Sequence, residues 1–187
     1  DVPKGEVSCE GDWSNGAFLL CLERFSNIKA GNLSPDSRQG DKAIIDYLKM
    51  ADSGVDTVDI DCNDIPDIVP YMAVVAPFTF SKAVFRGISR LRIKESDRVS
   101  AVRQMLESIG VSTLEGEDEL TVYASDDTVR KDLPDPLYLS SYHDHRMAMC
   151  AILIAVILKA DVVIDDVECI DKSFPELRVI TEREFCP

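Results

Sequence analysis

The sequence predicts an α/β domain made of three similar helix–strand units. Three apolar segments each follow a polar or acidic cluster, and these clusters begin near Asp12, Asp64 and Asp144. A strand-like segment is expected after each apolar segment, most clearly in residues 160–171, which are rich in β-branched residues. Because the starts are unevenly spaced, the pattern indicates a loose internal repeat and a pseudo-threefold domain, not a solenoid.

The first unit is expected to run helix, strand, helix, strand. The helices span residues 11–25 and 39–51, and the strands span residues 26–33 and 55–62. A similar order of elements returns in the remainder of the chain.

The second unit begins with an apolar helix over residues 64–80, whose start we expect to be irregular. Pro66 suits a first helical turn, where its missing N–H costs little, but Pro70 is less comfortable there. Residues 81–93 are expected to form a strand with a break at Gly87.

The clearest amphipathic helix is expected over residues 95–110. Its apolar face consists of Val99, Val102, Met105, Leu106 and Ile109. Ser96 or Asp97 can cap its start, and Gly110 is typical of a C-terminal stop. A β-hairpin over residues 111–124 is predicted to follow.

The third unit follows a predicted loop over residues 126–141, which is rich in Asp, Pro and Ser. Residues 144–159 predict a helix buried on every side, because apolar residues occupy all of its faces. The β-branched residues of 160–171 predict a strand, and residues 172–185 begin another short helix.

The length and composition of the chain favour one globular domain, residues 1–187, with three subunits at roughly 7–60, 61–125 and 140–187. The chain is 45% apolar, which excludes a disordered protein. Its 20 basic residues are outnumbered by 34 acidic ones, and the net charge of −14 disfavours nucleic acid and anionic membranes as partners. The longest apolar run, residues 147–158, is too short for a membrane span, and the polar start does not resemble a signal peptide.

Six cysteines are scattered through the chain without a C-x-x-C pair. They are Cys9, Cys21, Cys62, Cys150, Cys169 and Cys186. This spacing does not favour a zinc or redox site, so we expect small core residues in a reducing compartment. A disulfide framework in a secreted protein is the alternative.

A basic cluster lies in the segment RLRIKESDR, residues 90–98, of this acidic chain. Lys94 and Arg98 are at the start of the amphipathic helix, where free N–H groups already favour anions. We therefore predict a site for phosphate or carboxylate, with Glu95 as an ionised acid–base group between the cations. The alternatives are a solvated loop with local ion pairs and, for Glu95, a plain helix-capping acid.

A second polar cluster, HDHR, precedes the most apolar helix. His143, Asp144 and His145 could be part of a metal site, but no further Cys or His stands at ligand spacing, so we predict no metal. Asp144 is expected to cap the helix. Arg146 must then reach solvent, an acidic partner in a buried ion pair, or an anion.

Asp67 and Lys172 stand beside two other predicted helix starts. Asp67 is either a first-turn acid that complements the helix dipole or a carboxylate that faces the same cleft as Glu95 and Arg146. Lys172, considered by itself, is expected to lie at the surface. The chain has no G-x-x-x-x-G-K-[ST] loop, G-x-G-x-x-G turn or H-E-x-x-H helix, so nucleotide, dinucleotide and zinc-protease functions lose support.

Together these segments resemble the 5-enolpyruvylshikimate-3-phosphate synthase family. The similar segments, in the order of that family, are EGDWSNGAFLL, QGD at 39–41, DCNDIPD at 61–67, RIKESDR at 92–98, HDHRMAM at 143–149 and DKSFPE at 171–176. His143 stands where the family has Asn. The matches spread over nearly the whole chain, so the resemblance is specific.

The resemblance implies both a fold and a reaction. Enzymes of this family have two similar domains, each a threefold repeat of helix–strand units with inner helices and outer sheets, and this chain would be one half. The reaction transfers the enolpyruvyl group of phosphoenolpyruvate to the 5-hydroxyl of shikimate 3-phosphate and releases phosphate, within the shikimate pathway of aromatic amino-acid biosynthesis. The resemblance implies neither a cofactor nor a metal.

The resemblance also implies a role for each site residue. Asp67 and Lys94 would contact shikimate 3-phosphate, Asp67 as a base at its 5-hydroxyl and Lys94 in proton movement. Glu95 would be the acid–base group at the methylene carbon of phosphoenolpyruvate, and His145 would support the site. The residues that bind phosphoenolpyruvate would be Arg98 and Arg146 at its carboxylate and Lys172 at its phosphate.

The N-terminal domain of this family also contributes residues to both substrates, and its motifs are not found in the sequence. We therefore expect a C-terminal domain that is inactive alone and has the N-terminal domain as its partner. One alternative is a non-catalytic anion-binding module on the same fold. Another is the related transferase acting on UDP-N-acetylglucosamine, against which the RIKESDR and DHRMAM matches speak. The expected location is the bacterial cytoplasm, with a plant plastid as the alternative.

Overall fold

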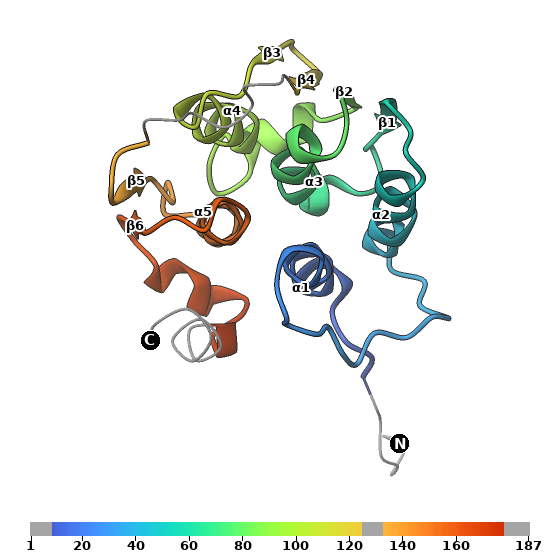
Figure 1. Ribbon diagram of the computed structural model, residues 1–187. Coiled ribbons are helices and arrows are strands. Elements are labelled where there is room, and N and C mark those ends of the chain that lie inside the picture. The colour runs from blue at the N-terminus through green and yellow to red at the C-terminus, as the bar shows by residue number, and fades with distance from the viewer. Residues whose placement is uncertain (1–8, 125–132, 178–187) are drawn as a thin grey trace.

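Helices lie inside and strands lie along the outside of the folded chain (Figure 1). The computed structural model describes residues 9–124 and 133–177. Viewed along their axes, the helices are grouped centrally and the strands follow the rim (Figure 1). The predicted α/β class with inner helices and outer sheets is therefore confirmed. Within the described ranges, no helix is long and apolar enough to cross a membrane.

The α-helices begin and end close to where the sequence predicts. They are α1 (Trp13–Phe25), α2 (Ile44–Asp52), α3 (Val69–Val75), α4 (Arg98–Ser108) and α5 (His145–Leu158), with short 3₁₀ helices η1 (Gly40–Ala43), η2 (Pro66–Ile68), η3 (Ala76–Phe78), η4 (Ser89–Ile93) and η5 (Glu168–Lys172). The side chains of Asp12, Asp97 and Asp144 cap α1, α4 and α5 by accepting hydrogen bonds from first-turn N–H groups. Gly110 takes a φ of 86° just after α4, as its role as a stop requires.

The strands form two sheets on the outside. β1 (Thr57–Asp61), β2 (Lys82–Arg86), β3 (Thr113–Glu115) and β4 (Glu119–Tyr123) form one sheet in the order β1-β2-β4-β3, and β5 (Leu137–Leu139) and β6 (Val162–Ile164) form the other. β1 is parallel to β2, whereas β2–β4 and β3–β4 are antiparallel. The β3–β4 pair is the predicted hairpin, and β5 is parallel to β6.

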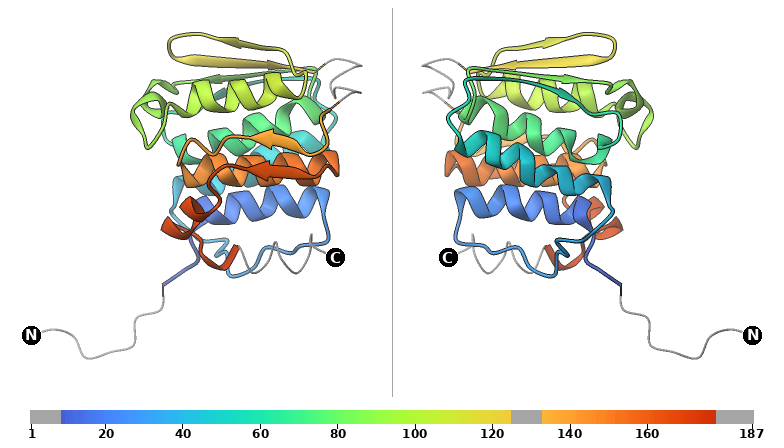
Figure 2. Two further views of the ribbon diagram at one scale, coloured as in Figure 1. Left: turned by 90° about the vertical axis from the view of Figure 1, so that its left-hand side faces the viewer. Right: turned by 90° about the vertical axis from the view of Figure 1, so that its right-hand side faces the viewer.

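The core lies where α1, α3 and α5 pack side by side (Figure 2). Every residue of α3 is buried, and so is α5 from His145 to Ile154. The last turn of α5 is only partly buried, so the prediction of a helix buried on every side holds for most of its length. Phe18 of α1 contacts Tyr71 of α3 with ring centroids 5.6 Å apart, which joins the two helices through an aromatic pair.

The predicted strand over residues 26–33 is wrong. Asn32 there takes a left-handed φ of 59°, and its C=O accepts a hydrogen bond from the N–H of Gly11 at 3.1 Å. A left-handed residue interrupts an extended ladder, so this segment forms a loop that packs back against the start of α1.

The predicted loop over residues 126–141 is also wrong in part, because it contains β5. Leu137 and Leu139 are buried on either side of exposed Tyr138, which is the alternation of a strand with one face on the core. The surrounding Asp and Pro residues hide this short pattern. The beginning of the predicted loop, up to residue 132, lies outside the described residues.

Two further strands are shorter than predicted. β2 ends before Gly87, whose φ is 71°, and the rest of the expected strand over 81–93 turns into η4. Likewise, most of the segment 160–171 is not extended, because η5 begins soon after β6. The final predicted helix begins at Glu176, and its remainder from residue 178 lies outside the described residues.

Candidate functional site

Four helix starts meet at one end of the domain. Continuous hydrogen bonds join the first residues of α1, η2, α4 and α5, through Asn15, Asp67, Arg98, Asp144 and Arg146. The helices lie side by side, so their starts can share this end (Figure 2). Because a helix start exposes N–H groups and a partial positive charge, this end of the domain favours anions.

Arg98 is the centre of this network. Its side chain is only 2% exposed, and it contacts Asp144 twice, from Nε at 2.8 Å and from Nη2 at 3.2 Å. It also donates from Nη1 to Asp67 at 2.9 Å and from Nη2 to Glu95 at 2.7 Å. Burial alone would lower its pKa, but the carboxylates, led by Asp144, outweigh it and raise the pKa of Arg98. One buried cation thus holds together three carboxylates from separate segments.

Two partly exposed lysines form further ion pairs with carboxylates of this network. The Nζ of Lys94 lies 3.4 Å from Asp67 Oδ1, and the Nζ of Lys172 lies 2.6 Å from Glu95 Oε1. The hydrogen bond from Lys172 is the main reason why the pKa of Glu95 falls to about 2. Because these ion pairs are partly exposed, they stabilise the fold little, and their cations can exchange partners with an incoming anion.

Asp67 is a half-buried carboxylate surrounded by cations. Burial disfavours its charged form, but Arg146, Lys94 and Arg98 together outweigh burial and hold its pKa below the ordinary value of 3.8. Asp67 is therefore ionised at neutral pH, which is the state that a proton acceptor needs.

Arg146 is a buried cation that forms no ion pair with any described residue. Its Nη1 donates to the hydroxyl of Tyr71 at 3.0 Å and to Asn15 Oδ1 at 3.4 Å, and its guanidinium carbon lies 5.8 Å from the centroid of the Tyr71 ring. Its Nε is buried without a hydrogen-bond partner. A buried cation without a carboxylate is costly. Arg146 can therefore bind an anion. The alternative, a buried ion pair, is not observed among the described residues.

The two histidines have different surroundings. His145 is 6% exposed, and its Nδ1 has no hydrogen-bond partner and lies 3.6 Å from Asp144 Oδ1. The side chain of His143 is 83% exposed and pairs with Asp166 at 2.7 Å. The HDHR segment thus turns its histidines apart, and the described His, Cys, Asp and Glu residues form no group that could hold a metal ion.

We expect the two histidines to titrate on opposite sides of the ordinary pKa of 6.5. Burial, followed by the charge of Arg146, lowers the pKa of His145, whereas the hydrogen bond to Asp166 raises the pKa of His143. The stability linked to His145 is therefore present above pH 6.5 and is lost as the pH falls below it. An NMR titration of the imidazole signals tests this, with His143→Asn to assign them. A His145 signal that titrates above that of His143 would contradict the expectation.

The charged residues named from the sequence come together at this end. They are Asp67, Lys94, Glu95, Arg98, Arg146 and Lys172. Two partners, Asn15 and Tyr71, were missed, and Ser96 was named only as a candidate helix cap. Asn15 donates to the C=O of Ser173 at 2.9 Å, and Ser96 donates to Asp144 at 3.0 Å. The only signal for Tyr71 is a hydroxyl within an otherwise apolar helix.

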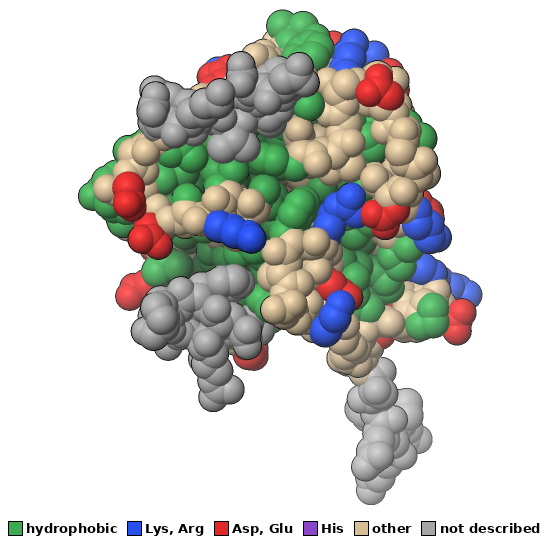
Figure 3. All heavy atoms as spheres, in the orientation of Figure 1, with side chains coloured by type: hydrophobic (Ala, Val, Ile, Leu, Met, Phe, Trp, Pro, Cys, Tyr) green, Lys and Arg blue, Asp and Glu red, His purple; other side chains and the backbone are tan. Residues whose placement is uncertain are grey.

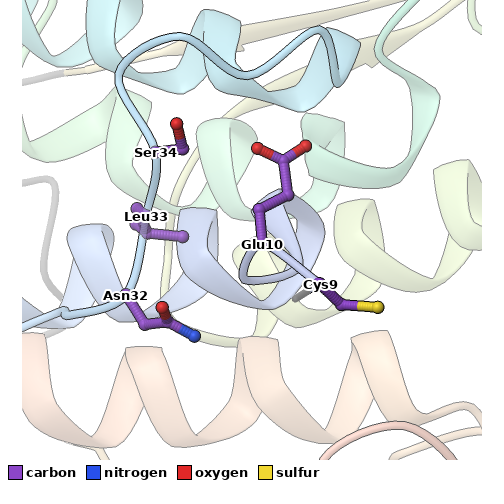
Figure 4. Close-up of a pocket in the computed structure, with 5 residues that line it drawn as sticks. All are labelled: Cys9, Glu10, Asn32, Leu33 and Ser34. Carbon is purple, nitrogen blue, oxygen red and sulfur yellow. The ribbon is translucent and has the colours of Figure 1, made fainter. Parts of the chain in front are cut away.

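Two other surface features offer less to an anion. The hollow in Figure 4 is lined by Cys9, Glu10, Asn32, Leu33 and Ser34, none of which is basic. On the face in Figure 3, acidic and basic side chains are interspersed among hydrophobic side chains. The hollow thus offers no cation among the residues that line it, and the charges visible on the face in Figure 3 are of both signs.

Comparison with known proteins identifies the family. The family model for EPSP synthase (3-phosphoshikimate 1-carboxyvinyltransferase) matches residues 1–179. The chain belongs to the EPSP synthase family. A 3-phosphoshikimate 1-carboxyvinyltransferase from Clostridium beijerinckii is 33% identical over 183 residues, which cover 89% of this chain and 41% of the relative. The protein of the same name from Buchnera aphidicola is 32% identical over 187 residues, which cover 91% of this chain and 42% of the relative.

A solved EPSP synthase has the same fold as this chain. The structure from Acinetobacter baumannii matches with a TM-score of 0.74 at 19% identity, over 97% of this chain and 48% of that one. The chain thus spans about two fifths of the length of the curated relatives it matches and about half of the solved structure.

Proposed function

We propose that this chain supplies one half of an active site that transfers the enolpyruvyl group of phosphoenolpyruvate to shikimate 3-phosphate and releases phosphate. The observation that carries the proposal is the meeting of cations and ionised carboxylates at the helix starts of an EPSP synthase family domain. The other half of the site would come from a complementary N-terminal domain, because the chain covers only 41% of the relative from Clostridium beijerinckii.

Both proposed substrates are multiply anionic, and the cations of the network suit them. The unpaired guanidinium of Arg146, with Arg98 beside it in the network, offers planar donors to the carboxylate of phosphoenolpyruvate. Lys172 would leave Glu95 for the phosphate of phosphoenolpyruvate, and Lys94 would leave Asp67 for shikimate 3-phosphate. His145, buried beside Asp144, would support the arrangement.

The two carboxylates divide the proton transfers between them. Asp67 accepts the proton of the 5-hydroxyl as its oxygen bonds to the central carbon of phosphoenolpyruvate, and Glu95 donates a proton to the methylene carbon. The tetrahedral adduct then returns a proton from its methyl group to Glu95 as its C–O bond to phosphate breaks, and the leaving phosphate takes up the proton that Asp67 accepted. The surrounding cations stabilise the negative charge of the adduct.

The Lys172–Glu95 ion pair explains how Glu95 could become an acid. While Lys172 contacts it, Glu95 has a pKa of about 2 and carries no proton at neutral pH. Transfer of Lys172 to the substrate phosphate removes the largest cause of that low pKa, so substrate binding would raise the pKa of Glu95 towards a useful value.

We propose the bacterial cytoplasm as the location. All described cysteines are free, as is usual in a reducing compartment, and the relatives from Clostridium and Buchnera are bacterial.

Phosphate release tests the proposed function. The chain is assayed with phosphoenolpyruvate and shikimate 3-phosphate, alone and mixed with the N-terminal half of a full-length relative. We expect release only from the mixture. Release by the chain alone would contradict the proposed division of the site. Binding of phosphoenolpyruvate without release from the mixture would instead favour an anion-binding module.

Replacing Arg146 with lysine is expected to weaken phosphoenolpyruvate binding about 10- to 100-fold, because charge-assisted hydrogen bonds from a planar group are lost. The measurement is the KM for phosphoenolpyruvate in the complemented mixture. Arg103→Lys is the matched control, since Arg103 pairs with Glu107 and Glu115 on the outside of α4. An unchanged KM for Arg146→Lys would remove this residue from the phosphoenolpyruvate site.

A further inference from the structure

The turn that leads into α5 has an unusual backbone. Tyr142 and His143 both take left-handed conformations, with φ values of 54° and 55°. Two consecutive residues with side chains rarely adopt this conformation, because Cβ then crowds the carbonyl oxygen. Neighbouring groups must therefore hold the turn in place against this preference.

Asp165 holds this turn from the end of β6. Its Oδ2 accepts a hydrogen bond from the hydroxyl of Ser140 at 2.6 Å, and its Oδ1 accepts from both the N–H and the hydroxyl of Ser141 at 2.7 Å. The pairing of Leu139 with Ile164 in the β5–β6 sheet brings the two segments together. Burial alone would raise the pKa of Asp165, but these hydrogen bonds outweigh it and lower the pKa to about 2.

Ser141 connects this surface contact to the buried network. It is completely buried, and its C=O accepts a hydrogen bond from the N–H of Asp144 at 2.9 Å. Asp144 in turn contacts Arg98 through both carboxylate oxygens and accepts from the N–H of Arg146 at 2.9 Å. A path of hydrogen bonds therefore runs from Asp165 to both arginines of the site.

We propose that Asp165 and Ser141 are positioning residues, which hold the left-handed turn so that Asp144 sets the places of Arg98 and Arg146. This inference rests on the proposed function for its effect on activity. Small displacements of groups that bind the reacting atoms can lower activity about 100-fold. The pair itself touches no reacting atom in this scheme.

The test compares Asp165→Ala with Asp161→Ala, which removes an exposed carboxylate just before β6. In the complemented mixture we expect Asp165→Ala to lower kcat/KM for phosphoenolpyruvate about 10- to 100-fold, and Asp161→Ala to leave it within about twofold. The conservative variant Asp165→Asn should recover most of the activity, because its amide oxygen can still accept from Ser141.

A second readout does not depend on activity. The backbone N–H of Arg146 donates to Asp144, so its NMR signal in the chain alone reports the place of this helix start. We expect Asp165→Ala to shift this signal, and the added change His143→Asn to restore it in part, because Asn tolerates a left-handed backbone better than His.

The outcomes separate the two proposals. If the unaltered mixture releases no phosphate, the proposed function fails, and the Arg146 amide signal alone decides the positioning role. If Asp165→Ala matches Asp161→Ala in kcat/KM and in the Arg146 signal, the positioning role is overturned. It is also overturned if Asp165→Ala lowers only the unfolding temperature and leaves both readouts unchanged.

Discussion

Asp144→Ala is expected to destabilise the domain by about 3–5 kcal/mol, because it removes the fully buried carboxylate that contacts the guanidinium of Arg98 twice. Asp144 has no exposed surface, so water cannot replace the lost carboxylate at that position. The same change removes the cap of α5, which contributes about 1 kcal/mol in other helices. Urea unfolding of the chain followed by circular dichroism measures the effect.

A surface ion pair provides the control for this prediction. Asp52→Ala breaks the contact between Asp52 and Arg24, whose side chains are 69% and 26% exposed, and it should cost less than about 1 kcal/mol. Adding Arg98→Met to Asp144→Ala should recover part of the lost stability, because the buried guanidinium that has lost its buried carboxylate is then gone. If Asp144→Ala costs no more than Asp52→Ala, Arg98 does not depend on this partner.

Glu95→Gln is expected to lower kcat about 10²- to 10⁴-fold in the complemented mixture, the usual contribution of a general acid–base group. The amide cannot donate a proton to the methylene carbon or take one back. The KM for phosphoenolpyruvate should change little, because the variant removes an interaction needed in the transition state. Steady-state phosphate release at several substrate concentrations separates the two quantities.

Glu115→Gln is the matched control for this second prediction. Glu115 also pairs with cations, Arg92 and Arg103, but these pairs join β3 to η4 and α4 and include none of the proposed site residues. We expect its kcat to stay within about twofold of the unaltered mixture. A Glu95→Gln variant with normal kcat and a raised KM would show that Glu95 only binds substrate.

Much of the fold could be predicted because its signals are local. Asp144 caps α5 as expected, and of the two candidate caps of α4, Ser96 and Asp97, it is Asp97 that caps the helix. The hairpin of β3 and β4 and the helix α5 are likewise specified by neighbouring residues. The strand β5 was missed because a three-residue alternation is too short to outweigh the Asp and Pro residues around it.

The contacts of the site could not be predicted, because they join distant segments. Nothing in the sequence states that Arg98 contacts Asp144, 46 positions away, or that it is almost completely buried. The charged residues were identifiable by type and by family resemblance. Their division into a buried hub, Arg98, and an unpaired cation, Arg146, depends on how the helix starts meet.

The edges of the larger sheet have a consequence for how copies of this chain meet one another. β1 and β3 are its two edge strands, and they carry the carboxylates of Asp59 and Asp61 on β1 and of Glu115 on β3. Edge-to-edge pairing of two copies would bring like charges face to face, within molecules that each have a net charge of −14. We therefore expect the acidic edges to disfavour strand-to-strand pairing of copies near neutral pH, although Asp59 and Glu115 are already paired with arginines of their own chain.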